Sequence, residues 1–595
     1  MCGILFKTSY HSKTDKKKFE EALDLLTHRG PNEEGILYND NYSFGHKRLS
    51  IRDITNGKQP MSILNHHLIY NGEIYNTKEI IDELQNKPKS HSDTEVLLRL
   101  LIEKREFALD KLNGIFSFVY TDNKGVLASR DSIGVKPLYY TIYNDELMIA
   151  SEIKCLLAYG KEAVFTASEA KELLAMYPSH TPGKTLYNGI YELKPGHYLT
   201  YDKTDGLKIY PYFEVKREKL DMKLKDIIDY TRYLVSDSVS RQLVSDVGIS
   251  SFLSGGLDSS IISALAKEKL KNIDTYSIDY EGNKEDFKEN EFEKTRDEDY
   301  IKLLKACKGY NHKSVVINTN TIFDYLKTAV ILRDSPGMTD IDSSMLYLAK
   351  EISKKHSCGL SGECADELFG GYPWFKAYKT IDNFPWIRNI EFRESLIRKD
   401  LKDKLNIKSY LKDEFTKAIE QAPVDKDDDL LKVKELQMNY INLKYFMPTL
   451  LERKDRMTMG ASLEVRVPFA DKRLVNFTYN IPYHYKNYNG IEKAILREAF
   501  KDILPKEIIN RKKSPYPKSQ ARSWHNKIKY ELGRILETDT PLNKIFDINE
   551  LKKLVKDDEE LAVPWFGQLM RKDALMAFLY QIHYWLNEYK IRVEI

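Results

Sequence analysis

Cys2 is a candidate nucleophile because it directly follows the initiator methionine. Methionine is normally removed when the next residue is small, and its removal would leave Cys2 at the N-terminus. The thiol would then share one residue with an α-amino group, whose pKa of roughly 8 leaves it partly neutral near pH 7. A neutral amine can accept the thiol proton, which is the N-terminal form of a nucleophile paired with its base. The letters MCG alone fit an ordinary terminal cysteine equally well, so residues further along the chain must decide.

A second reactive pattern, SGGLDSS, spans residues 254–260, between an expected strand and an expected helix. Its glycines allow a tight turn, its serines supply hydroxyl donors, and the start of the helix adds amide donors and the positive end of the helix dipole. Together these groups form a cradle for pyrophosphate. Asp258 would repel a phosphate unless a cation lay between them, which makes it a candidate Mg²⁺ ligand. Glycine-rich turns are common as purely structural elements, but SGGLDSS directly after an apolar strand is a much more specific signal of nucleotide binding.

Composition sets the size and broad class of the protein. A chain of 595 residues is too long for a single core, so we expect two domains. Lys and Arg number 92 against 89 Asp and Glu, and this balance gives no sign of nucleic-acid or anionic-membrane binding. The five cysteines are scattered and form no CxxC pair, which argues against disulfides and cysteine-based zinc sites. With no leader-like segment and no apolar run near 20 residues, we expect a soluble cytoplasmic protein.

The elements that must position these motifs fall into two patterns. Up to about residue 210 the chain is rich in strands, and helices are expected at 15–30 and 92–114, which indicates a layered α+β domain. Strands are expected at 3–8, 34–40, 42–51, 66–75, 114–122, 125–131 and 137–151. The polar stretch at 201–221 is interpreted as the boundary between domains covering 1–210 and 211–595.

From residue 222 helices and strands alternate, which predicts a parallel sheet with helices on both faces. Helices are expected at 223–246, 259–270 and 297–309, and strands at 248–254, 273–280, 312–320 and 358–362. The charged residues 283–297 are interpreted as a surface insertion. Beyond Gly371 the chain is predicted to be mostly helical.

Several motifs in a fixed order resemble the glutamine-dependent asparagine synthetase family over nearly the whole chain. SGGLDSS is similar to the pyrophosphate loop of ATP-pyrophosphatases, which cleave ATP between its α and β phosphates. The other motifs are HRGPNEEG (28–35), RLSI (48–51), YNGEIYN (70–76), SDTE (92–95), RDSIGVKPLYY (130–140), SGECADELFGGY (361–372), LEVRVPF (463–469) and EKAILR (492–497). The resemblance implies an αββα sandwich of the Ntn-hydrolase type, then an α/β ATP-pyrophosphatase domain with a helical C-terminal region.

In the first domain the resemblance implies a glutaminase that uses Cys2 as its nucleophile. Arg48 is the candidate partner for the α-carboxylate of glutamine, because guanidinium pairs with carboxylate through two hydrogen bonds. Glu73 and Asp93 are implied partners of the α-ammonium, and the Asn71 side chain and Gly72 backbone are the implied oxyanion hole. Without the family context, Arg48 fits a surface ion pair. Asp93 fits a helix N-cap.

In the second domain the resemblance implies ATP bound with Mg²⁺ held by Asp258 and Asp366. Glu363 is the implied base for the attack of ammonia, and Lys493 is placed near the leaving phosphates, although it also fits an exposed helical position. Phe252 and Ile278 are expected beside the adenine. The expected nucleotide-binding residues are Phe252, Ser254, Gly255, Gly256, Leu257, Asp258, Ser259, Ser260, Ile278, Ser361 and Gly362.

Three positions depart from the family pattern: Asn32 and Ser132, where the family more often has Asp and Pro, and Cys364, where it often has Gly. We interpret Asn32 and Ser132 as structural loop positions. Cys364 lies beside Glu363, so the local backbone could differ there.

The leading interpretation is an enzyme that converts aspartate to asparagine with glutamine and ATP, releasing AMP and pyrophosphate. An alternative keeps both half-reactions but amidates another carboxylate, such as a diaminopimelate residue in cell-wall precursors. Recognition of the acceptor is expected in stretches such as 334–345, where Asp340 and Asp342 fit either an amino-group site or a helix cap, and a cap is the default. The expected partners are the small molecules glutamine, aspartate and ATP, and a homodimer is left open.

Other proteins on related scaffolds fit less well. A β-lactam-forming synthetase uses no glutamine and typically lacks the N-terminal Cys, whereas Cys2, Asn71, Gly72 and Asp93 are all present. SGGLDSS excludes a phosphoribosyl amidotransferase. A non-enzymatic relative would be expected to have lost Cys2, Asp258 or Glu363. Two separate sites also require a route for ammonia, and we hypothesise an apolar passage across the domain interface.

Overall fold

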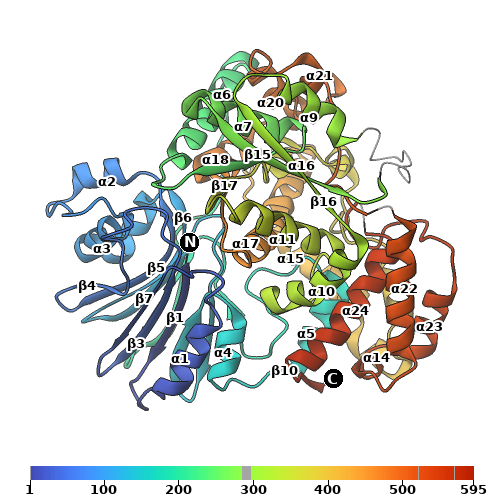
Figure 1. The fold of residues 1–595 in the computed structure, drawn as a ribbon, viewed down its shortest axis with the longest axis horizontal. Coiled ribbons are helices and arrows are strands. Elements are labelled where there is room, and N and C mark those ends of the chain that lie inside the picture. Colours follow the sequence, from blue (N-terminus) through green and yellow to red (C-terminus); the bar gives the residue numbers. More distant parts are fainter. Residues whose placement is uncertain (1, 284–295, 520, 569) are drawn as a thin grey trace.

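The computed structural model of the protein describes residues 2–283, 296–519, 521–568 and 570–595 (Figure 1). The charged stretch at 283–297, predicted to be a surface insertion, lies almost entirely outside these ranges.

The N-terminal domain contains two six-stranded sheets whose paired strands are all antiparallel, drawn mainly in blue in Figure 1. The first has the order β11-β8-β9-β1-β3-β2. Its strands are β11 (Tyr191–Glu192), β8 (Tyr139–Tyr143), β9 (Glu146–Ala150), β1 (Cys2–Thr8), β3 (Tyr42–Arg48) and β2 (Glu33–Tyr38). The second has the order β13-β12-β7-β6-β5-β4. Its strands are β13 (Gly206–Pro211), β12 (His197–Asp202), β7 (Gly125–Arg130), β6 (Gly114–Asp122), β5 (His66–Ile74) and β4 (Met61–Ile63).

The two sheets pack face to face between two layers of helices. Ile4 and Phe6 of β1 join Ile69 of β5 and Val119 of β6 in one buried cluster, whereas Leu5 points the other way. This alternation follows from the period of two along a strand. Helices α1 (Lys16–Asp24) and α4 (Ile153–Tyr159) cover the first sheet, and α3 (Asp93–Lys104), with α2 (Thr77–Glu83) beside it, covers the second. The predicted αββα sandwich is confirmed.

Two details of this domain differ from the sequence prediction. The single strand predicted at 137–151 is a hairpin, β8–β9, that turns at Asn144 and Asp145 with φ of 51° and 59°. Positive φ at both central residues is typical of the tight turns that match the twist of paired strands. Part of the stretch interpreted as a boundary is also regular, because residues 206–211 form β13 and pair with β12.

The second half of the chain is built on a parallel sheet with the order β16-β15-β14-β17-β18. Its strands are β16 (Tyr310–Ile317), β15 (Ile273–Tyr280), β14 (Ile249–Phe252), β17 (Cys358–Leu360) and β18 (Glu464–Arg466). Helices α6 (Leu224–Gln242) and α7 (Leu257–Leu270) form one layer, and α10 (Thr319–Arg333), α11 (Asp340–Ser353) and α17 (Met447–Met459) form the other. The predicted parallel sheet is confirmed. The short edge strand β18 was not predicted.

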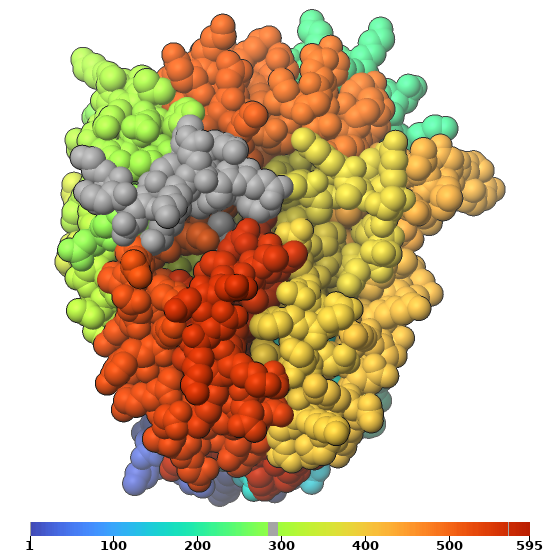
Figure 2. Space-filling model, turned by 90° about the vertical axis from the view of Figure 1, so that its right-hand side faces the viewer, coloured from blue at the N-terminus to red at the C-terminus, as the bar shows by residue number. Residues whose placement is uncertain are grey.

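Helices make up most of the remaining chain, and Figure 2 shows a face formed largely by this C-terminal half. Their bounds are α9 (Asp297–Lys305), α12 (Ala365–Phe369), α13 (Ile390–Ser395), α14 (Lys399–Leu405), α15 (Ile407–Glu420), α16 (Leu430–Ile441), α18 (Lys472–Asn480), α20 (Ala494–Ala499), α22 (Arg522–Leu536), α23 (Ile548–Lys556) and α24 (Lys572–Glu588). The last strand, β19 (Arg592–Glu594), pairs in parallel with β10 (Val164–Thr166), so the chain end returns to the first domain. Within the described residues, no helix is both long and apolar enough to cross a bilayer.

Candidate active sites

Cys2 begins β1 in the middle of the first sheet and is 7% exposed. Its backbone N–H donates a hydrogen bond to Asn71 Oδ1 on β5, across 2.9 Å. Burial raises the pKa of the Cys2 thiol. A thiolate is the reactive form of cysteine, so the thiol at this position needs a nearby group to take its proton.

Asn71 and Gly72 follow one another on β5 beside Cys2. The amide oxygen of Asn71 is occupied by the Cys2 N–H, while its Nδ2 lies 3.4 Å from Ser117 Oγ as a donor. Glycine is required at position 72, because a Cβ there would lie 2.1 Å from the carbonyl oxygen of Ile115 on β6. The structure therefore brings the two predicted oxyanion donors next to the predicted nucleophile.

Glu73 and Asp93 are buried near each other at the edge of this site. Burial, and after it the charge of Asp93, raises the pKa of Glu73 well above its usual value. Asp93 accepts hydrogen bonds from the Tyr70 hydroxyl (2.9 Å) and the Ile74 N–H (3.0 Å). The side chain that caps α3 is Ser92, which leaves Asp93 in the first turn. Two buried carboxylates close together provide a suitable environment for an ammonium group.

Arg48 is held by its own domain. Its guanidinium donates to Glu33 Oε2 at 2.6 Å and to the carbonyl oxygens of Asp53 and Ile54 at 2.8 and 2.9 Å. These contacts fix the side chain at the end of β3, opposite Cys2 in the strand register. Binding of a substrate carboxylate by Arg48 stays a prediction.

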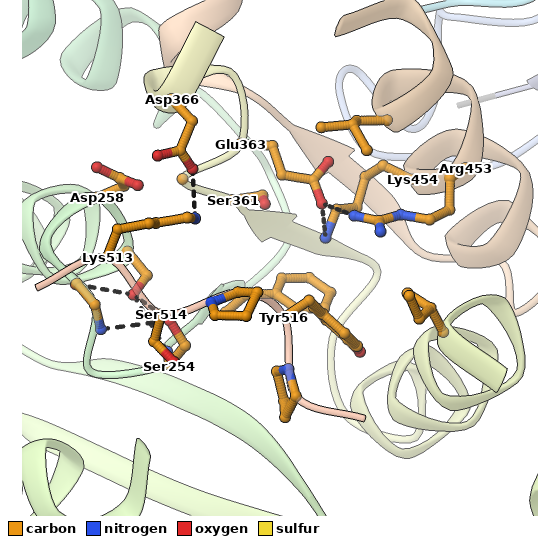
Figure 3. A pocket seen from close by; sticks show the side chains of 18 of the residues that line it. Ser254, Asp258, Ser361, Glu363, Asp366, Arg453, Lys454, Lys513, Ser514 and Tyr516 are labelled. Carbon is orange, nitrogen blue, oxygen red and sulfur yellow. Dashed lines mark hydrogen bonds and ion pairs between the residues drawn. The ribbon is translucent and has the colours of Figure 1, made fainter. Parts of the chain in front are cut away.

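The predicted nucleotide loop lies at one end of a cavity of about 230 Å³ in the second half of the chain (Figure 3). Its lining includes the end of β14, the loop after β17, one side of α17, and residues 511 and 513–517. Eight of the expected nucleotide-binding residues line it: Phe252, Ser254, Gly256, Asp258, Ser259, Ile278, Ser361 and Gly362. Gly255, Leu257 and Ser260 are not among the lining residues.

The loop is folded tightly by its own small side chains. Ser259 Oγ accepts from the Ser254 N–H at 3.2 Å and donates to the Gly256 carbonyl at 3.2 Å. Gly362 packs against this loop so closely that a Cβ there would lie 2.7 Å from Ser259 N. The amides at the start of α7 therefore face the loop after β17, an arrangement suited to an anion.

Asp258 and Asp366 come from distant segments and meet through lysines. Lys493 Nζ lies 2.6 Å from Asp258 Oδ2 and 2.5 Å from Asp366 Oδ1, and Lys513 Nζ lies 2.5 Å from Asp366 Oδ2. Burial raises the pKa of Asp258. Burial also opposes ionisation of Asp366, but Lys493 and Lys513 outweigh it and lower its pKa to about 2.

These two carboxylates fit a magnesium site in which the substrate supplies the remaining ligands. Asp258 Oδ1 is buried and has no hydrogen-bond partner among the described residues. The part of the chain that the structure describes contains no cluster of three or more candidate metal ligands. Mg²⁺ is commonly held by one or two carboxylates with phosphate oxygens and water as its other ligands.

Glu363 extends into the same cavity from the loop after β17 (Figure 3). Its Oε1 lies 2.8 Å from Arg453 Nη2 and 3.1 Å from Lys454 Nζ, both on α17. Its Oε2 is buried and makes no hydrogen bond to any described residue. One oxygen is thus fixed by two cations, and the other is free to accept a proton.

Two other sequence interpretations concern the backbone around this cavity. Cys364 has φ of 76°, so this position adopts the left-handed conformation that glycine prefers, at some cost in strain. Asp340 and Asp342 lie in the first turn of α11, where Asp342 Oδ2 accepts the Met338 N–H at 2.8 Å. The N-cap residue of α11 is Thr339, so neither aspartate occupies the capping position that was named as one alternative.

The sequence interpretation missed four cations of the cavity: Arg453, Lys454, Arg511 and Lys513. Arg511 donates to the Ser254 carbonyl at 3.0 Å and thereby supports the phosphate loop. Two runs could have signalled these residues: ERKDR at 452–456, inside the buried helix α17, and RKK at 511–513. Consecutive charges in an otherwise buried segment indicate paired charges rather than a solvated surface.

The fold and these two sites define a two-domain protein with an N-terminal glutamine amidotransferase fold joined to a parallel-sheet domain. Residues 1–213 match the glutamine amidotransferase domain family, and residues 231–587 match the asparagine synthase family. The chain therefore belongs to the asparagine synthase family.

Three of its relatives match between 62% and 100% of this chain. Asparagine synthetase [glutamine-hydrolyzing] 3 of Bacillus subtilis is 41% identical, and the match covers 100% of both chains. Asparagine synthetase [glutamine-hydrolyzing] 1 of the same organism is 29% identical over 93% of each chain. A putative asparagine synthetase [glutamine-hydrolyzing] 2 of Methanocaldococcus jannaschii is 29% identical over 62% of this chain and 76% of its own.

Proposed function

We propose that this protein is a glutamine-dependent asparagine synthetase that acts in the cytoplasm. The observation that carries the proposal is the cavity in which the SGGLDSS loop, Asp258, Asp366 and Glu363 converge. This cavity combines a phosphate cradle with a carboxylate whose second oxygen is unpaired. In the other domain Cys2 lies beside two oxyanion donors, so each half-reaction has its own set of groups.

In the first domain, Cys2 Sγ attacks the side-chain amide carbon of glutamine. The negative charge that develops on the amide oxygen would be stabilised by Asn71 Nδ2 and the Gly72 N–H, and one such donor contributes about 3 kcal/mol. The carbon–nitrogen bond then breaks and ammonia leaves with the proton of the thiol. Water hydrolyses the remaining thioester to glutamate and restores the thiol.

In the second domain, a carboxylate oxygen of aspartate attacks the α-phosphorus of ATP, and pyrophosphate leaves. Ammonia then attacks the acyl carbon of the β-aspartyl adenylate, Glu363 Oε2 accepts a proton, and AMP leaves as asparagine forms. Lys493 and Lys513 lie where they can balance the phosphate charges. A magnesium ion held by Asp258 and Asp366 would supply further charge neutralisation on the phosphates.

An apolar cluster across the domain interface supports the hypothesised ammonia passage. Leu49, Ile115 and Val135 of the first domain belong to the same contiguous buried cluster as Leu360 and Val467 of the second. Leu360 lies three residues before Glu363, and Leu49 follows Arg48, which pairs with Cys2 in the strand register. Apolar walls would favour neutral ammonia over ammonium, because burial disfavours the charged form.

Aspartate as the acceptor is supported by the names of the relatives. The test is to incubate the purified protein with ATP, Mg²⁺, glutamine and a panel of carboxylates, and to identify the amidated product by mass. Asparagine formed together with AMP and pyrophosphate, one of each per turnover, supports the proposal. Release of ADP and phosphate, or amidation of another acid in preference to aspartate, would contradict it.

A further inference from the structure

Five consecutive charged residues, Glu452 to Arg456, lie on α17 at the interface between the two halves of the chain. All five are buried, with exposed fractions of 9% or less. Charged side chains are rarely buried in such a run unless each has a partner. Their partners come from both halves of the chain, and they connect the two sites described above.

On one side of the helix the run holds Glu363. Arg453 Nη2 and Lys454 Nζ both contact Glu363 Oε1, at 2.8 and 3.1 Å. The other oxygen of this carboxylate stays free of hydrogen bonds to the described residues. The two cations therefore fix the orientation of the Glu363 carboxylate, as Figure 3 shows.

On another side the run reaches the environment of Cys2. Asp455 Oδ2 accepts a hydrogen bond from Arg29 Nη2 at 2.9 Å. The same guanidinium donates through Nε to the carbonyl oxygen of Cys2, at 3.1 Å, and through Nη1 to Glu152 Oε1, at 2.9 Å. Arg29 is fully buried, so its fork connects the peptide of the nucleophile directly to α17.

Helical geometry explains how neighbouring residues can serve different sites. Successive residues are turned by about 100°, so residues 453 and 455 point to nearly opposite sides of the helix, while the backbone advances only about 3 Å between them. Glu452 and Arg456 anchor the same turn, through Arg333 at 3.0 Å and Asp334 at 2.9 Å. The turn is therefore held by ion pairs on several sides, with partners in both halves of the chain.

We propose that this turn of α17 is a shared positioning element, in which Arg453 and Lys454 position Glu363 for the attack of ammonia and Asp455, through Arg29, positions Cys2. This inference rests on the proposed function. The inference goes beyond that function by assigning the alignment of Cys2 and Glu363 to one helical turn. None of the three residues is a catalytic residue under this assignment, because each acts through another side chain.

The synthetase side of the proposal is tested with Lys454→Met, which keeps the length of the side chain and removes its charge. We expect ammonium-dependent asparagine formation to fall about tenfold or more, because small misplacements of a reacting group are costly. Glutamine hydrolysis and the aspartate-dependent exchange of labelled pyrophosphate into ATP should stay within about twofold of wild type, since neither requires ammonia to attack. Lys454→Arg should restore most of the loss.

The glutaminase side is tested with Asp455→Asn. We expect kcat for glutamine hydrolysis to fall about tenfold with little change in KM, while ammonium-dependent synthesis persists and shows that the protein is folded. The matched control is Asp471→Asn. Asp471 is also a buried aspartate at this interface, and it accepts a hydrogen bond from Asn113 Nδ2 at 3.3 Å. It caps α18 as well, a role that asparagine performs equally well.

The proposal is overturned if Lys454→Met lowers pyrophosphate exchange as much as product formation, which would mean that it acts on ATP itself. It is also overturned if Asp455→Asn hydrolyses glutamine as fast as the control. Failure of the wild-type protein to make asparagine would contradict the proposed function instead, so the two failures are distinguishable.

Discussion

The backbone N–H of Cys2 donates to Asn71 Oδ1 across 2.9 Å, and this hydrogen bond decides which way the Asn71 amide faces. With its oxygen occupied, Asn71 keeps its Nδ2 as a donor, and Ser117 Oγ lies 3.4 Å from it. The interaction joins two residues 69 positions apart, the first on β1 and the second on β5, which belong to the two facing sheets.

Replacing Asn71 by Asp removes the donor and keeps the shape of the side chain. We expect kcat for glutamine hydrolysis to fall about 100-fold, because a carboxylate cannot donate to the developing oxyanion. Steady-state glutamate release is the measurement, and Asn41→Asp on the exposed turn between β2 and β3 is the control. An unchanged rate of glutamine hydrolysis would show that Asn71 is not part of the oxyanion hole.

Cys2→Ala should abolish the use of glutamine and leave ammonium-dependent synthesis intact. The reason is that the thiol is the proposed nucleophile of one site and lies outside the cavity of the other. Asparagine formation is measured with each nitrogen source in turn, and Cys307→Ala removes a half-buried thiol elsewhere as a control. Glutamine hydrolysis that survives in Cys2→Ala would refute the assignment of the nucleophile.

Asp258→Asn should stop asparagine formation with both nitrogen sources. The variant loses a charge that the phosphates and their cation require, while the glutaminase domain is untouched. Release of AMP and pyrophosphate should fall by at least about 100-fold, and glutamine hydrolysis serves as the internal control. Normal pyrophosphate release by this variant would show that Asp258 has no role at the phosphates.

Gly362→Ala tests the close packing of the two loops around the nucleotide. A Cβ at this position would lie 2.7 Å from Ser259 N and 2.8 Å from the Asp258 carbonyl carbon, so the SGGLDSS loop would have to shift. We expect KM for ATP to rise about tenfold or more. Gly533→Ala in α22 is the control, because the nearest atom to its Cβ is 3.6 Å away. Equal KM values for the two variants would contradict the prediction.

His180 should make the stability of the domain interface depend on pH. Burial alone would lower its pKa, but Glu192 and Glu452 outweigh burial and raise the pKa to about 9. A histidine whose folded pKa is raised stabilises the fold fully below its ordinary pKa near 6.5, and loses that contribution as pH rises through 9. The loss amounts to about 3 kcal/mol.

Thermal midpoints of wild type and His180→Gln between pH 6 and 9.5 measure this effect. The wild-type protein should have the higher thermal midpoint. Its advantage over His180→Gln should be largest near pH 6 and should shrink toward pH 9.5. A difference that is constant across this range would show that His180 does not carry a raised pKa.

The sequence by itself determined the motifs and the class of each domain. Cys2, SGGLDSS and SGECADE are local patterns whose chemistry depends on residues close together in the chain. The order of strands and helices predicted a layered α+β domain followed by a parallel sheet, and the family resemblance implied the αββα sandwich. The turn at Asn144 and Asp145 was not separated from the strands on either side of it. The strand β13 was missed, because a short polar segment becomes a strand only when a neighbouring edge offers hydrogen bonds.

Only the tertiary structure decided which distant charges meet. Arg29 and Asp455 are 426 residues apart, and Lys493 reaches Asp258 across 235 positions. The sequence shows that a helix contains charged residues. Which residue pairs with each charge, and so offsets the cost of burying it, depends on how the elements pack together. The proposed alignment of the two sites through α17 therefore depends on contacts that exist only in the folded chain.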